Sequence, residues 1–207
     1  MANLDQRRIA AYYDRLVDLY GHDPRACDAS SAASLSTRYE ILSQVSNLAG
    51  KSVLEVGCGF GDLGAYLRSK YDGVRYLGID VSRRMVEEGR RSHPELSLRV
   101  QDVLEMDGAV RFDVVLAQGI FYLLGRGADK KMRALIEKMF ALANEALAFC
   151  AISKWDPGEP GDEFLVDPKA LLSACRRLTP RLVLRHDYLP HDVAIYLYKT
   201  SLAIGGR

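Results

Sequence analysis

The sequence predicts an α/β fold, in which a mostly parallel sheet of seven strands carries helices on both faces. The first observation is the alternation of short apolar runs with helical segments from Lys51 onward, which is typical of a parallel sheet covered by crossover helices. The second is a glycine-rich turn directly after the first apolar run. The third is a pair of strand-like runs that lie too close together for a crossover helix, and these predict an antiparallel hairpin.

Residues 1–50 are predicted to form a helical cap with a lid. Apolar and aromatic side chains recur there at spacings of three and four residues, which places them on one face of a helix: Ile9, Tyr12, Tyr13, Leu16, Val17 and Tyr20. The polar segment 21–34 interrupts that pattern and is the candidate lid, in which His22 is interpreted as an isolated polar residue. A second helix is expected over 37–48.

Residues 51–207 are predicted to form the sheet and its covering helices. The runs expected as parallel strands are SVLEV, YLGID, SLRVQD, FDVVLAQ and ALAFCAIS. Before the last of these, one helical face holds Met132, Leu135, Ile136, Met139, Phe140 and Ala143. Asp167 and Pro168 are expected as the N-cap and first residue of a further helix. The runs RLVLRHDYL and VAIYLYK would form the hairpin, and WDPGEPGDEF a loop.

The composition indicates one soluble domain over residues 1–207. The 28 Lys and Arg residues nearly balance the 27 Asp and Glu residues, so no overall field favours nucleic acid or an anionic membrane as a partner. No apolar run approaches the roughly 20 residues that cross a bilayer, which predicts a cytoplasmic protein. No disulfide framework or metal site is expected, because the cysteines are widely spaced: Cys27, Cys58, Cys150 and Cys175.

The segment VLEVGCGFGDL carries the strongest functional signal, because a strand runs directly into Gly57, Gly59 and Gly61 and then into a helix. Glycines let the backbone approach a ligand closely, and a helix N-terminus offers free N–H groups. Asp80 ends the next strand, where a carboxylate can accept hydrogen bonds from both hydroxyls of a ribose, and Asp102 ends the strand after it. Since the carboxyl ends of parallel strands meet at one edge, these features predict a single nucleotide-like ligand.

These motifs resemble those of the class I S-adenosylmethionine-dependent methyltransferases, over residues 51–124 in motif and as far as Lys199 in strand order. The resemblance implies a Rossmann-like sheet with a reversed final strand, and S-adenosylmethionine as cofactor. An NAD-dependent dehydrogenase is the alternative. The glycine spacing G-x-G-x-G disfavours it, because Asp62 stands where the last glycine of the dinucleotide motif should be.

The resemblance also implies a role for each part of the cofactor site. Residues 55–61 would hold the methionine part, with Glu55 bracing the turn, while Asp80 would bind the ribose and Asp102 the adenine amine. Tyr13 and Arg38 would reach the cofactor from the cap. The full set of expected cofactor-binding residues is Tyr13, Arg38, Glu55, Gly57, Cys58, Gly59, Gly61, Asp80, Val81, Asp102, Val103, Gln118 and Gly119.

Methyl transfer from a sulfonium is an in-line displacement, so positioning does most of the work and few catalytic residues are needed. A neutral acceptor would need a base within hydrogen-bond reach. The candidates are His186 and Asp187 at the terminal hairpin, whose cluster continues through Tyr188, His191 and Asp192. Phe121 and Tyr122 after the fourth strand would wall the acceptor pocket, with Tyr122 as a catalytic residue that positions the acceptor, or would pack beneath a loop. Ser153, Lys154 and Trp155 would grip an anionic or aromatic acceptor. The alternative interpretation is that the hairpin residues only satisfy the turn backbone.

The fourth-strand segment AQGIFYLL lacks the Asn/Asp-Pro-Pro-aromatic motif with which similar enzymes methylate planar amines. A near-neutral chain without a basic domain also disfavours RNA and DNA. A small-molecule acceptor is therefore predicted for a monomer or homodimer. Two alternatives stay open, namely a protein or nucleic-acid methyltransferase and a regulatory protein that binds the cofactor without catalysis.

Overall fold

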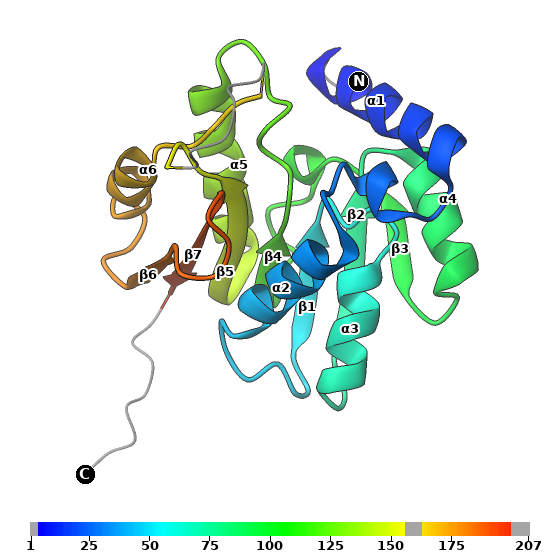
Figure 1. Cartoon of the computed structure of the whole chain (residues 1–207). Helices are drawn as coiled ribbons and strands as arrows, with labels where there is room; N and C mark the ends of the chain where they lie inside the picture. The colour runs from blue at the N-terminus through cyan, green and yellow to red at the C-terminus, as the bar shows by residue number, and fades with distance from the viewer. Residues whose placement is uncertain (1–3, 156–162, 200–207) are drawn as a thin grey trace.

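The computed structural model describes residues 4–155 and 163–199, with seven strands in one sheet. Figure 1 shows how the helices and strands are arranged around this sheet. In chain order they are α1 (Leu4–Tyr20), the 3-10 helix η1 (Pro24–Cys27), α2 (Ala32–Ser43), β1 (Ser52–Val56), α3 (Asp62–Lys70), β2 (Arg75–Asp80), α4 (Arg83–Ser92), β3 (Ser97–Val100), the 3-10 helix η2 (Val103–Glu105), β4 (Phe112–Ala117), α5 (Ala128–Leu142), β5 (Ala143–Ile152), α6 (Pro168–Cys175), β6 (Leu182–Arg185) and β7 (Asp192–Tyr198). None of the helices within the described residues is long and apolar enough to span a membrane.

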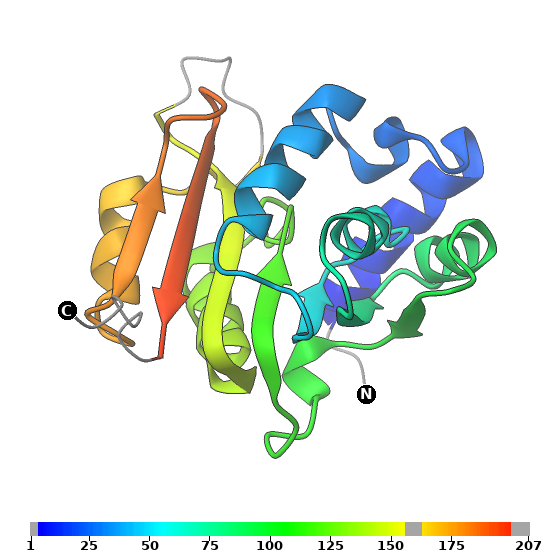
Figure 2. The ribbon, with the colours of Figure 1, turned by 90° about the horizontal axis from the view of Figure 1, so that it is seen from below.

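The strands follow the order β3-β2-β1-β4-β5-β7-β6. The pairs from β3 to β5 are parallel, whereas β7 pairs antiparallel with both β5 and β6. Figure 2 shows β6 in orange and β7 in red running in opposite directions at that end of the sheet. The predicted Rossmann-like sheet with a reversed final strand is confirmed. Because β6 runs in the same direction as β5, its carboxyl end lies at the same edge as those of β1, β2 and β4.

Helices cover both faces of the sheet. Successive residues of each strand point to opposite faces, and both sets of residues are largely apolar. On one face, Val115, Phe149 and Ile195 pack in a cluster with the apolar sides of α5 and α6. On the other face, Val114, Ala148 and Tyr196 pack with residues of α2, α3 and α4. These two layers enclose the strands whose ends carry the candidate site.

The N-terminal helix is the predicted cap. The aromatic stripe of α1 packs through Tyr13, Leu16 and Val17 against Phe60 of the glycine turn and Met85 of α4. Figure 1 shows α1 crossing the edge of the molecule beside α4. The cap therefore contacts the core directly at the turn that follows β1.

Four predicted boundaries were wrong. The second helix begins at Ala32 rather than residue 37, because the Ser31 side chain caps it by accepting a hydrogen bond from the Ser34 N–H group at 3.1 Å. It ends at Ser43 rather than residue 48. Ala143, expected on a helix, begins β5. Asp192, expected in the hairpin turn, is the first residue of β7. The predicted start of α6 is confirmed, since Asp167 is its N-cap and Pro168 its first residue. Residues 156–162 of the predicted loop lie outside the described residues.

Candidate active site

The glycine turn after β1 is held close to the neighbouring strand. The N–H groups of Gly57 and Cys58 both donate to the Ile79 carbonyl, at 2.8 and 3.0 Å. Gly57 has a φ of +73°, and a Cβ atom there would lie 2.3 Å from Cγ2 of Ile120. Only glycine fits this position, because a side chain would be strained by the left-handed backbone and would overlap Ile120.

Asp80 lies at the carboxyl end of β2 and fastens the turn. Its Oδ2 atom accepts a hydrogen bond from the Gly59 N–H group at 2.8 Å, and its Oδ1 atom accepts one from the Ser82 N–H group at 2.8 Å. The side chain is buried, and burial raises the pKa of its carboxyl group against the lowering effect of these backbone bonds. Each carboxylate oxygen keeps a further lone pair, so Asp80 can still accept hydrogen bonds from a ligand.

Glu55 lies in β1, one residue before the carboxyl end of this central strand. It is 3% exposed, and the Tyr76 hydroxyl group donates a hydrogen bond to its Oε2 atom. Burial raises the pKa of Glu55 to about 8, so the folded protein holds this carboxyl group largely protonated at neutral pH. The Tyr76 ring fits there because Gly64 and Gly78 leave room that a Cβ atom would fill.

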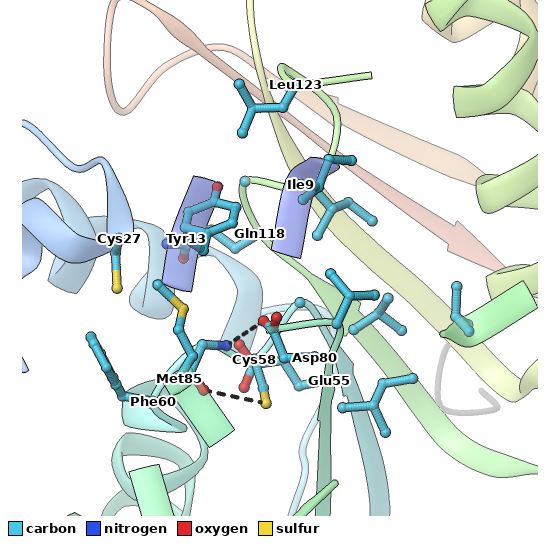
Figure 3. A pocket seen from close by; sticks show the side chains of 18 of the residues that line it. Ile9, Tyr13, Cys27, Glu55, Cys58, Phe60, Asp80, Met85, Gln118 and Leu123 are labelled. Atoms are coloured by element: carbon cyan, nitrogen blue, oxygen red, sulfur yellow. Dashed lines mark hydrogen bonds between the residues drawn. The ribbon is translucent and has the colours of Figure 1, made fainter. Parts of the chain in front are cut away.

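A cavity opens at this edge of the sheet, between the strand ends and the cap. Figure 3 shows Ile9 and Tyr13 of α1 on one side and Glu55, Cys58 and Asp80 on the other. Four carboxyl groups line the cavity, and none of its described lining residues is Lys, Arg or His. The strand ends and the segments that follow them contribute Glu55, Gly57, Cys58, Gly59, Asp62, Asp80, Val81, Asp102, Val103, Gln118, Gly119 and Ile120 to the lining.

Gln118 follows β4 and has a buried carbonyl oxygen without a partner. Its Oε1 atom accepts no hydrogen bond within the described part of the chain. Unsatisfied buried polar atoms are rare and costly in native proteins, so this atom is prepared for a ligand donor. Asp102 is half-buried and uses Oδ1 to accept from the Leu104 N–H group at 2.9 Å, while Oδ2 accepts no hydrogen bond from residues 4–155 or 163–199.

The hydroxyl groups of Tyr13 and Tyr122 contact each other and join the cap to the segment after β4. The Tyr122 hydroxyl also lies 3.2 Å from Oδ2 of Asp28. Burial raises the pKa of both phenols far above the usual range, so neither loses its proton at physiological pH. Tyr122 is therefore a hydrogen-bonding and packing group in this structure.

Five of the predicted site residues do not line the cavity, namely Arg38, Gly61, Tyr122, His186 and Asp187. Arg38 forms an ion pair with Asp192, and its Nη2 atom lies 3.2 Å from Oδ1. Asp187 is paired with Arg185 at 2.9 Å. His186 lies apart from the cavity lining, with Nε2 at 2.7 Å from the Ser153 hydroxyl and its ring 5.0 Å from that of Trp155.

Several cavity residues were missed by sequence reasoning. Ile9, Tyr39 and Met85 line the cavity from α1, α2 and α4, and Cys27 does so from η1. Their helical spacing indicated packing only, because periodicity does not tell which helix crosses the edge of the sheet. Leu123, two residues beyond Phe121, also lines it, whereas Phe121 packs in the core.

The parallel sheet, the glycine turn and the acidic strand ends define a nucleotide-binding α/β enzyme of the Rossmann-like class. Residues 54–145 match the family model described as "Methyltransferase domain". The chain is 31% identical over 163 residues to "Putative methyltransferase Rv1506c" of Mycobacterium tuberculosis, which covers 72% of this chain and 94% of that protein. The chain belongs to the class I S-adenosylmethionine-dependent methyltransferases.

Solved structures share the fold. Magnesium protoporphyrin IX methyltransferase from Synechocystis PCC 6803, with bound S-adenosylhomocysteine, superposes with a TM-score of 0.70 at 17% identity, over 95% of this chain and 100% of that one. Geranyl diphosphate C-methyltransferase from Streptomyces coelicolor A3(2) gives a TM-score of 0.69 at 15% identity, over 96% and 99%. At these identities the similarity establishes the fold.

Proposed function

We propose that this chain transfers a methyl group from S-adenosylmethionine to a small-molecule acceptor. The observation that carries the proposal is the acidic lining of the cavity, where Asp62, Asp80 and Asp102 lie beside the largely protonated Glu55 and no described lining residue is basic. The donor carries a positive sulfonium and a positive ammonium group. Carboxylates within a partly enclosed cavity attract such charges more strongly than they would in water.

The lining residues fit this ligand in detail. The unpartnered Oε1 atom of Gln118 offers an acceptor to the ammonium group. Asp80 would bind the ribose hydroxyls with the lone pairs that Gly59 and Ser82 leave free. Asp102 and Val103 would bind the adenine ring, since both lie at the cavity edge beyond β3. Gly119 has a φ of +65° and nothing within 4 Å of a Cβ position, so the backbone there is open to a ligand.

When bound, S-adenosylmethionine supplies a methyl group on a sulfonium, which is an excellent leaving group. The chain contributes orientation and the exclusion of water. The contact between the Tyr13 and Tyr122 hydroxyls closes the cap over the cavity. Val56, Ile79 and Ile120 supply apolar wall around the carboxyl groups. Precise positioning of this kind accounts for about 7–11 kcal/mol of barrier reduction in well-oriented reactions.

His186 remains our candidate for the base that a neutral acceptor would require. It lies at the carboxyl end of β6, at the same sheet edge as the cavity, and an imidazole can accept a proton near neutral pH. Ser153 and Trp155 orient its ring. Asp187 is a weaker candidate, because Arg185 engages both of its oxygens and its side chain is 64% exposed.

The small-molecule assignment has two supports. The chain has a formal net charge of +1, so no basic surface excess favours a polyanion. As their names state, two structural neighbours act on magnesium protoporphyrin IX and geranyl diphosphate. A protein or nucleic-acid acceptor, and binding without catalysis, are the competing functions.

The test has two stages. Isothermal titration calorimetry should show binding of S-adenosylmethionine and S-adenosylhomocysteine but not of NAD, and failure of the first two at millimolar concentration would refute the cofactor site. Methyl transfer from a labelled donor to a panel of small acids, phenols and amines should then give a product. Binding with no transfer to any panel member, to protein or to RNA would favour a regulatory role.

His186 can be tested once an acceptor is found. If it is the base, His186→Ala should lower turnover by about 100- to 10,000-fold with unchanged S-adenosylhomocysteine affinity. Asp187→Asn serves as the neighbouring control and should keep turnover within about twofold. Wild-type turnover in both variants would leave the hairpin with a structural role only.

A further inference from the structure

Two histidines and a carboxylate from distant parts of the sequence meet beside the glycine turn. The Nε2 atoms of His22 and His93 each lie 2.9 Å from Oδ1 of Asp62. The possible ligand atoms of the three side chains all lie within 4.8 Å of one another. His22 follows α1, Asp62 begins α3 and His93 is the C-cap residue of α4.

The other ring nitrogens face polar neighbours. Nδ1 of His22 is within hydrogen-bond distance of the Ser92 hydroxyl, at 2.8 Å. Nδ1 of His93 lies 4.0 Å from Oε1 of Glu95, which is beyond hydrogen-bond distance but within reach of a charge interaction. In metal sites a polar partner on the second ring nitrogen fixes the ring and frees the first nitrogen as ligand. Here both rings present Nε2 to the same point.

We propose that His22, Asp62 and His93 form a binding site for a divalent transition metal ion, with Zn²⁺ as the preferred occupant. Two neutral imidazoles and one carboxylate suit Zn²⁺, whose bonds to nitrogen and oxygen are about 2.0–2.2 Å. Tetrahedral coordination places neighbouring ligand atoms roughly 3.3 Å apart. The Asp62 oxygen would therefore move only a few tenths of an ångström from each Nε2 atom.

A bound ion would tie the cap to the core. His22 lies in the connection between α1 and η1, and its ring packs 4.3 Å from that of Phe60 in the glycine turn. Asp62 lines the cavity. The three ligands thus belong to the cap, the helix after the turn and the helix after β2. Metal binding here does not require methyl transfer, although Asp62 is shared with the cavity lining, and its effect is to hold the cap closed.

The competing explanation is a cluster of hydrogen bonds, in which Asp62 accepts from both imidazoles without a metal. Zinc titration separates the two. Chelator-treated protein without a histidine tag should bind one equivalent of Zn²⁺ by calorimetry. His22→Ala and His93→Ala should each weaken binding at least about 100-fold, and Ser92→Ala by about 10- to 100-fold. His191→Ala, which removes a histidine outside this cluster that lies beside Arg38, should bind as the wild type does.

Two further readouts protect the test against misfolding. Circular dichroism should match the wild type for each variant, and His93→Gln replaces His93→Ala if the latter unfolds. Co²⁺ should give visible absorption bands with the wild type that His22→Ala and His93→Ala lose. Hydrogen exchange in residues 4–27 should slow on addition of Zn²⁺ in the wild type alone.

The proposal fails if the wild type binds no Zn²⁺ at 100 µM or binds it equally in the histidine variants. Loss of binding in only one histidine variant contradicts a three-ligand site. Binding without slower hydrogen exchange in residues 4–27 contradicts the closing of the cap.

Discussion

The Oδ2 atom of Asp80 accepts a hydrogen bond from the N–H group of Gly59, 21 residues earlier in the chain, at 2.8 Å. The same carboxylate accepts from the Ser82 N–H group through Oδ1. A residue expected only to bind a ribose therefore also holds the glycine turn against β2. Substitutions at Asp80 will change both the stability of the turn and the affinity for ligand.

Asp80→Asn should weaken S-adenosylhomocysteine binding by about 10- to 100-fold, because a hydrogen bond to a charged group contributes about 1.5–3 kcal/mol. The amide also leaves Gly59 or Ser82 without an acceptor, so the free energy of unfolding should fall by about 1–3 kcal/mol. Calorimetry and urea unfolding measure the two effects. Asp102→Asn is the matched control and should cost less than tenfold in affinity, since Asp102 is half-buried. Equal affinities in both variants and the wild type would disprove the ribose assignment.

Gly57→Ala should abolish measurable cofactor binding and destabilise the fold, because the new Cβ atom would lie 2.3 Å from Cγ2 of Ile120. Gly50→Ala is the control for backbone strain alone. Gly50 has a φ of +70° and nothing within 4 Å of its Cβ position, so the cost there should be about 1–2 kcal/mol. Adding Ile120→Ala to Gly57→Ala should recover part of the stability. No recovery in the thermal melt would show that the overlap with Ile120 is not the cause.

Glu55 should make the protein less stable as the pH rises. Its pKa is about 8 in the folded protein against an ordinary value of 4.5, so between these values the folded state holds a proton that the unfolded state releases. Stability from this group is complete below about pH 4.5 and is lost toward pH 8, at roughly 1.4 kcal/mol per pH unit. Glu55→Gln lacks this dependence. In urea unfolding from pH 5.5 to 8.5, the free energy of unfolding of the variant should rise relative to that of the wild type. A difference between the two that does not change with pH would mean that Glu55 is charged in the folded protein.

Arg38→Ala should reduce stability without changing cofactor affinity. The Arg38 side chain is 13% exposed and that of Asp192 only 2%, so removal of the cation leaves a buried carboxylate unpaired. Such losses cost about 3–5 kcal/mol. Adding Asp192→Ala should restore part of this, because no buried charge then remains. A loss of S-adenosylhomocysteine affinity at unchanged melting temperature would instead support the cofactor contact expected from the sequence.

The sheet could be predicted from the sequence because its signals are local. The apolar runs marked each strand, and the short gap before VAIYLYK showed that the last strand must turn back. The start of α2 could not be predicted in this way. Ser31 and Thr37 are both plausible caps in the sequence, and only the packed structure selects Ser31. Ala143 was placed on a helix because it fits the helical spacing of α5 and the strand alternation of β5 equally well.

The candidate site was predictable where strand ends determine it. Glu55, Asp80, Asp102 and Gln118 all line the cavity, because parallel strands deliver their carboxyl ends to one edge. Arg38 could not be placed, since its partner Asp192 is 154 residues away. The cluster around Asp62 was missed for the same reason, because His22 and His93 lie 40 and 31 residues from it and no spacing links them.

The position of β7 also affects how the chain acquires its structure during synthesis. All seven residues of this strand are buried, and it fills the gap between β5 and β6 although it is made after both. Until residue 198 has left the ribosome, β5 presents a long edge of unpaired backbone groups that invites pairing with other chains. A nascent chain of this protein is therefore prone to aggregation until β7 has been made and has paired with β5. Chaperones that shield exposed strand edges should associate with the chain before that point.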